Sequence, residues 1–214
     1  MNQKNKKSKG FTLVELIVVM AGFLLIMAVA IVIFISIIQS QRKILMQNQL
    51  LNQTSYLIEY MSKGLRMAER DIAGSCLVYV DAGGEVVDFF PGYNYLYTKP
   101  NGGFYGGLKF INANSSFCQE FYLDSEDNLI KELKNSINEI NAVQLISDKF
   151  DVDYFRIAVN ETNGAVGEGE ILGSSIDDQR QPRVTISAGF SVPGDNGNPS
   201  LKIQTTISQR NINE

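Results

Sequence analysis

The sequence predicts an α+β protein in which a long N-terminal helix packs on a C-terminal antiparallel β-sheet. The N-terminal part has a charge-free apolar run that continues into a segment with helical periodicity, whereas the rest of the chain alternates with the period of two typical of strands. The expected divisions are a basic leader (residues 1–10), an apolar helix (11–38), its amphipathic continuation (39–74) and a β-rich domain (75–214).

The apolar run covers residues 16–38, which include no charged side chain. At about 1.5 Å per residue, a helix of this length spans roughly 34 Å, enough to cross the core of a bilayer. A core helix of a globular protein would show a polar stripe, and this run shows none. The run is therefore predicted to be a transmembrane helix.

The flanking charges predict its orientation. Lys4, Lys6, Lys7 and Lys9 precede the run, and two basic residues at 42–43 follow it. This asymmetry favours a cytoplasmic N-terminus, a single pass through the cell (inner) membrane and an exported C-terminal domain. The run is longer than the apolar region of a cleavable secretory signal and has no small-x-small site after it, so a membrane anchor is expected.

Glu15 lies at the edge of the apolar run, where an unpaired carboxylate is costly and therefore indicates a functional residue. Residues 9–16 read Lys-Gly-Phe-Thr-Leu-Val-Glu-Leu. With the basic leader and the apolar run, this segment resembles the type IV prepilin (class III) signal peptide. In that signal a glycine is followed by an aromatic residue, with a glutamate five places after the glycine.

The resemblance assigns roles to three residues. Gly10 matches the residue after which prepilin peptidase cuts, and Phe11 matches the new N-terminus, which the same enzyme methylates. Glu15 matches the carboxylate that neutralises the N-terminal amine of a neighbouring subunit. Cleavage would create a cationic amine at Phe11, and an acid in an apolar filament core needs such a partner. The implied partners are prepilin peptidase, other pilin or pseudopilin subunits, the inner-membrane assembly platform and membrane lipid.

The resemblance implies a pilin-like fold and a structural subunit of a type IV pilus or of a type II secretion pseudopilus. Major pilins often carry a proline near the middle of the membrane segment, where this chain has Val32, which favours a minor subunit. Residues 181–186 and 203–210 are similar to the closing strands of prepilin-like proteins, including J-type minor pseudopilins. The alternative is a pilin-tailed display module, an adhesin or DNA-uptake receptor, whose exported domain binds a ligand.

The helix is expected to continue beyond the membrane and to stop at Gly74-Ser75, because residues 39–72 contain no proline and one glycine. Apolar and small side chains recur on one face, which predicts packing on a sheet of the same subunit or, alternatively, on a partner helix. The stripe consists of Leu51, Thr54, Ile58, Met61, Leu65, Ala68 and Ile72.

The domain after this helix is expected to be a series of strands. A hairpin is predicted around the turn at residues 81–84, and residues 91–107, rich in Gly, Tyr and Asn, are predicted to form a long surface loop. Residues 141–146 fit no single structure. The expected strands are 76–80, 85–90, 108–111, 117–123, 129–133, 152–159, 184–192 and 201–208.

Composition argues against several functions. The chain has no histidine, which removes the most common general base and metal ligand, and it has no nucleotide-binding fingerprint. We therefore expect no enzyme activity, cofactor or metal. Without the leader the chain has 15 basic and 23 acidic residues, a net charge of −8, which makes nucleic acid an unfavourable partner.

Other clusters have open or structural interpretations. Cys76 and Cys118 either form a disulfide outside the cytoplasm or remain as two buried thiols. Residues 124–128 are interpreted as a solvated acidic turn rather than a calcium site, and Asp148, Asp151 and Asp153 as an acidic strand edge. Five aromatic side chains are expected to pack the long loop onto the sheet rather than to bind glycans or a partner. They are Tyr93, Tyr95, Tyr97, Phe104 and Tyr105.

Overall fold

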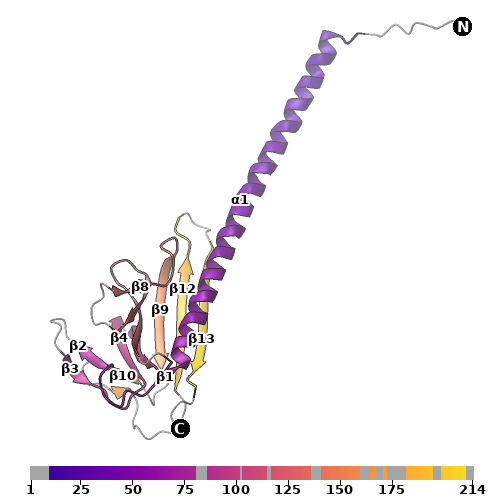
Figure 1. Ribbon diagram of the computed structural model, residues 1–214. Helices are drawn as coiled ribbons and strands as arrows, with labels where there is room; N and C mark the ends of the chain where they lie inside the picture. The colour runs from indigo at the N-terminus through magenta and orange to yellow at the C-terminus, as the bar shows by residue number, and fades with distance from the viewer. Residues whose placement is uncertain are drawn as a thin grey trace, which may run out of the picture. The chain divides into compact units, whose positions relative to one another are not determined.

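The structure is a computed structural model, and it confirms the predicted α+β layout (Figure 1). The residues it describes are 10–80, 86–101, 103–114, 117–135, 141–159, 164–166, 171–172, 182–194 and 199–210. The chain forms two compact units, Met1–Leu45 and Met46–Glu214. One continuous helix, α1 (Leu13–Arg66), contributes its first part to one unit and its last part to the other.

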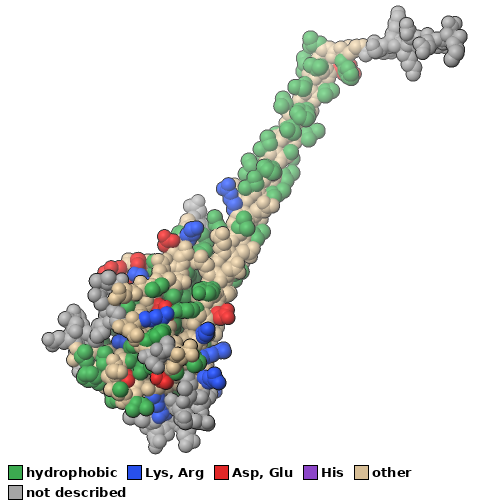
Figure 2. All heavy atoms as spheres, in the orientation of Figure 1, with side chains coloured by type: hydrophobic (Ala, Val, Ile, Leu, Met, Phe, Trp, Pro, Cys, Tyr) green, Lys and Arg blue, Asp and Glu red, His purple; other side chains and the backbone are tan. Residues whose placement is uncertain are grey.

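The first part of α1 exposes apolar side chains around its circumference. Its most apolar window buries no residue, and Figure 2 shows apolar side chains along the face in view. By length and composition, α1 can cross a membrane, and it is the one such helix among the described residues. A single candidate membrane span is thus part of the structure, as the charge-free run predicts.

The last part of α1 packs on the sheet of the same chain, which confirms one of the two alternatives for its apolar face. The buried face differs slightly from the predicted stripe: Leu51 is exposed and Ile58 half-buried, whereas Leu50 and Leu57 are buried. Gly64 is buried against the sheet, where a Cβ built on it would just touch the rings of Phe110 and Phe121, at 3.4 Å. The buried positions are Leu50, Thr54, Leu57, Met61, Gly64 and Leu65.

The prediction that the helix extends through residue 74 is wrong for its last eight positions. Helix α1 ends at Arg66, and Ala68–Glu69 form the short strand β1, which pairs with Asn112 and Ile111 of a later strand. Ladder hydrogen bonds to this distant segment replace further helical turns. As a result Ile72, assigned above to the apolar stripe, is 84% exposed.

Among the described residues, eleven strands form one sheet and two form a separate hairpin. The sheet runs β11-β10-β4-β5-β6-β7-β8, with β1 and β9 also pairing with β5, and β12 joining β9 to β13. Neighbours are antiparallel except β10 and β4, which are parallel. The remaining strands are β2 (Val78–Val80), β3 (Val86–Phe89), β4 (Tyr95–Asn101), β5 (Phe104–Asn112), β6 (Phe117–Leu123), β7 (Ile130–Lys134), β8 (Val143–Gln144), β9 (Asp151–Val159), β10 (Gly164–Val166), β11 (Ile171–Leu172), β12 (Arg183–Ser191) and β13 (Ser200–Ser208).

The predicted surface loop at 91–107 is the main error in the sheet. Most of it forms β4 and the start of β5, and Tyr95 and Tyr97 are buried. Its glycines do not all mark turns. A Cβ at Gly107 would lie 2.1 Å from the Thr98 Oγ1 atom, so this glycine allows two paired strands to fit together. At this position glycine allows close packing within the sheet and does not indicate a loop.

The predicted hairpin is confirmed as β2 paired with β3, and its turn lies outside the described residues. Beside it is a small second core made of Cys76, Leu77, Phe90 and Leu96. The larger core lies between α1 and the sheet and contains side chains from both.

Candidate functional site

The segment before α1 carries the predicted cleavage site. Gly10, Phe11 and Thr12 are not helical, and Phe11 is 80% exposed. Among the described residues, no atom beyond the chain neighbours lies within 4 Å of a Cβ built at Gly10. The Gly10–Phe11 peptide bond therefore lies in an exposed, non-helical segment, and residues 1–9 of the leader lie outside the described residues.

Thr12 and Glu15 form a reciprocal cap at the start of α1. The Glu15 N–H donates to Thr12 Oγ1 at 3.3 Å, and Glu15 Oε2 accepts from the Thr12 N–H at 3.5 Å and from its hydroxyl at 3.4 Å. This is a capping box, in which an N-cap Thr and a Glu three residues later satisfy two backbone donors. The sequence analysis missed this role, although the Thr-x-x-Glu spacing shows it.

The cap has an electrostatic consequence for a chain cut after Gly10. The new amine on Phe11 and the partial positive charge of the helix N-terminus would then lie close together in the chain. The carboxylate of Glu15, in the first turn of α1, is the acidic group in that turn and offsets this positive charge. The same residue can therefore stabilise its own helix end and attract an amine.

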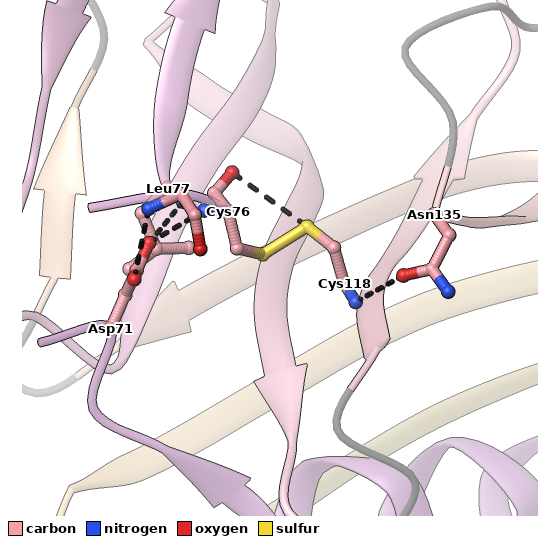
Figure 3. The surroundings of a disulfide bond; sticks show 6 residues. Asp71, Cys76, Leu77, Cys118 and Asn135 are labelled. Atoms are coloured by element: carbon pink, nitrogen blue, oxygen red, sulfur yellow. Dashed lines mark hydrogen bonds between the residues drawn. A yellow bond between two sulfur atoms is a disulfide. The ribbon is translucent and has the colours of Figure 1, made fainter. Parts of the chain in front are cut away.

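Cys76 and Cys118 form a disulfide, with their Cα atoms 5.5 Å apart. Of the two alternatives left open by the sequence, the structure therefore has the disulfide and not the pair of buried thiols. It joins the segment before β2 to strand β6. Figure 3 shows how both cysteine backbones are held. The Asp71 carboxylate accepts from the Cys76 and Leu77 N–H groups, each at 2.7 Å, and Asn135 Oδ1 accepts from the Cys118 N–H at 2.8 Å. Disulfides are typical of proteins that leave the reducing cytosol.

A lysine accompanies the acidic segment at 124–128. Lys131 Nζ lies 2.6 Å from Asp124 Oδ2 and 2.7 Å from Asp127 Oδ2. The hydrogen bond from Lys131 lowers the pKa of Asp124. The ammonium group of Lys131 thus neutralises two of the carboxylates that a bound metal ion would need. Within the described part of the chain, no group of three acidic or cysteine side chains is placed to hold a metal.

The aromatic residues divide into two environments. Tyr95 and Tyr97 belong to the main core, and the Tyr97 ring lies 4.5 Å from that of Tyr105. Phe104 remains 48% exposed, with the guanidinium carbon of Arg156 at 4.0 Å from its ring centre. These four side chains are therefore part of the sheet itself and do not attach a loop to it, whereas Tyr93 precedes β4 and packs against the ring of Phe90.

Comparison with protein-family models, with curated proteins and with solved structures found no match to this chain.

Proposed function

We propose that this chain is a type IV prepilin-like subunit that is cut between Gly10 and Phe11 and assembled through α1 into a type IV pilus or a type II secretion pseudopilus. The observation that carries the proposal is the order of features at the N-terminus. An accessible Gly10–Phe11 bond separates a basic leader from a capped helix with Glu15 in its first turn.

The two parts of α1 support distinct steps. Its first part is apolar on all sides and finds no partner within its own described chain, so it requires lipid before assembly and other apolar helices afterwards. Its last part is already buried against the sheet and keeps the domain attached to the helix. A subunit with this division can move from membrane to filament without unfolding its domain.

Cleavage and assembly are linked through charge. Hydrolysis of the Gly10–Phe11 bond removes the four leader lysines and leaves a protonated amine on Phe11 that prepilin peptidase would methylate. In the filament core, the Glu15 carboxylate would cost several kcal/mol if unpaired. The amine of an adjacent subunit supplies its partner and sets the axial register between neighbours.

The type of subunit is indicated by residue 32. It is a valine, whereas major pilins often carry a proline near the middle of the membrane segment, and this difference supports a minor subunit.

The test is the mass of the mature protein from a host with active prepilin peptidase. We expect a chain that begins with N-methylated Phe11, and we expect Gly10→Val to block processing because its β-branched side chain adds bulk beside the cleaved bond. Gly22→Val is the matched control, since Gly22 is also surrounded by open space but lies within the helix. It should be processed normally. A wild-type chain that still begins at Met1 would refute the proposal.

A further inference from the structure

A pocket of about 320 Å³ lies in the sheet where β5 changes partners. Gly107 of β5 pairs with Tyr122 of β6, whereas Tyr105, two residues earlier, pairs with Ile157 of β9. Along β5, pairing with β6 thus gives way to pairing with β9, and residues of β5, of β9, of the end of β6 and of the loop after it line the space between them. Its volume is at the lower end of the range for small-ligand pockets, about 300–1,000 Å³.

A β-bulge directs three polar or aromatic side chains to this pocket. In the pairing of β9 with β12, Tyr154 is opposite Gly189 and Val152 is opposite Phe190, so Asp153 is the extra residue. The buried positions on either side are Val152 and Phe155, and the two residues between them both face outward. Asp153, Tyr154 and Arg156 therefore share one face, which a regular strand would not allow.

The aromatic rings hold the guanidinium group of Arg156. Its central carbon lies 4.0 Å from the Phe104 ring centre and 5.4 Å from that of Tyr154. A Cβ at Gly189 would lie 2.5 Å from Tyr154 Cε1, so the Tyr154 ring depends on bare backbone opposite it. In the part of the chain that the structure describes, no acidic side chain forms an ion pair with Arg156. Its N–H groups are therefore available to a ligand.

Two more side chains present acceptors. Asp153 Oδ1 accepts from the Ser191 hydroxyl at 2.7 Å, which orients the carboxylate and leaves its second oxygen for a ligand. Asn128 donates its amide to the Val152 carbonyl at 3.1 Å, which leaves its own amide oxygen. The pocket thus combines one carboxylate, one guanidinium group, one amide and exposed aromatic surface, and its formal charge is zero.

We propose that this pocket binds a neutral saccharide. A sugar ring has an apolar C–H face that packs on an aromatic ring such as Phe104, and hydroxyl groups that both donate and accept hydrogen bonds. Asp153 and Asn128 accept from such hydroxyls and Arg156 donates to them. The opposite charges of Asp153 and Arg156 disfavour a strongly charged ligand. All these residues belong to the unit Met46–Glu214. Saccharide binding would therefore be a function in addition to filament assembly, and the proposal does not depend on the proposed assembly role.

The test uses the full chain in a detergent without a sugar headgroup. Saturation-transfer difference NMR would be recorded with maltotriose, cellotriose, triacetylchitotriose and mannotriose. We expect signal from at least one of them, and about tenfold or more weaker binding for Phe104→Ala. Phe89→Ala is the matched control, because Phe89 is 64% exposed on β3 and is not part of the pocket. It should bind as the wild type does.

Asp153→Asn provides a second variant that preserves shape. Its amide oxygen can still accept from Ser191, but the charge is lost, so binding should weaken while the far-UV circular dichroism stays unchanged. The proposal is overturned if none of the four trisaccharides gives signal, or if Phe104→Ala binds as well as Phe89→Ala. Binding of only a sulfated trisaccharide or an acidic peptide would also overturn it, because the ligand would then be an anion.

Discussion

At the residue scale, Glu15 combines two roles that its replacement by alanine cannot separate. Its carboxylate caps α1 together with Thr12, and in the proposed filament it pairs with an amine of another subunit. A change to alanine removes both. Because glutamine also serves in a capping box, the two roles can be separated.

We expect Glu15→Gln to leave membrane insertion and cleavage after Gly10 intact but to reduce incorporation into filaments, as Glu15→Ala should. The variant retains an acceptor for the Thr12 N–H and loses the charge that the Phe11 amine needs. Thr12→Val is the matched control: it loses the cap hydroxyl, at a cost of about 1 kcal/mol, and keeps the carboxylate. The measurement is the amount of each variant in sheared filaments relative to membranes.

Normal incorporation of Glu15→Gln together with poor incorporation of Thr12→Val would show that Glu15 acts only as a cap. The cleavage prediction would be unaffected by that result.

At the scale of elements, the contact between β4, β5 and β6 depends on one of two adjacent glycines. A Cβ at Gly107 would lie 2.1 Å from Thr98 Oγ1 and 3.0 Å from the Cβ of Tyr122, whereas at Gly106 the nearest neighbour is at 3.5 Å. Gly107→Ala should therefore lower the free energy of unfolding by about 1–3 kcal/mol through overpacking. Gly106→Ala should change it little. Urea unfolding of both variants makes the comparison, and equal stabilities would contradict the close packing of these strands.

The hairpin β2–β3 is expected to depend on the disulfide, because the core beside it is small, with four buried hydrophobic residues among those that the structure describes. Cys76 and Cys118 are 42 positions apart, a loop for which the chain-entropy model predicts a stabilisation of about 4 kcal/mol. We expect dithiothreitol to lower the urea midpoint of the wild type. Thiol labelling should require the reductant.

The double variant Cys76→Ser/Cys118→Ser serves as the control for that experiment. Its midpoint should be low from the start and should not respond to dithiothreitol. A wild-type protein that labels fully without reductant would contradict the disulfide.

At the scale of the whole molecule, the charge asymmetry and the disulfide both favour an exported domain. Alkaline phosphatase fused after Glu214 should be active, because that enzyme folds only outside the cytoplasm. β-Galactosidase fused at the same position, as the matched control, should be inactive. The opposite pair of activities at normal expression would reverse the proposed topology.

Local signals were sufficient for the elements that depend on short-range order. The period of two at 117–123 corresponds to β6, and the predicted strands at 184–192 and 201–208 correspond to β12 and β13 within one residue at each end. They failed at 91–107 and at the end of α1. At the end of α1, pairing of β1 with the distant strand β5 determined the outcome, and helical spacing contains no information about that partner. At 91–107 the strands β4 and β5 form a tight hairpin, and glycines that indicated a loop lie inside it, where they allow close packing.

The sequence by itself determined the apolar helix, the basic leader and the Gly10-Phe11 motif, because each depends on residues a few positions apart. It also contains the Thr-x-x-Glu spacing of the cap, although the cap was recognised only from the hydrogen bonds of the structure. Only the tertiary structure decided that Cys76 lies beside Cys118, that the helix gives way to β1, and that Phe104 meets Arg156. These contacts join residues far apart in the chain. Such contacts form when burial of apolar side chains in the whole fold outweighs what the local sequence would prefer.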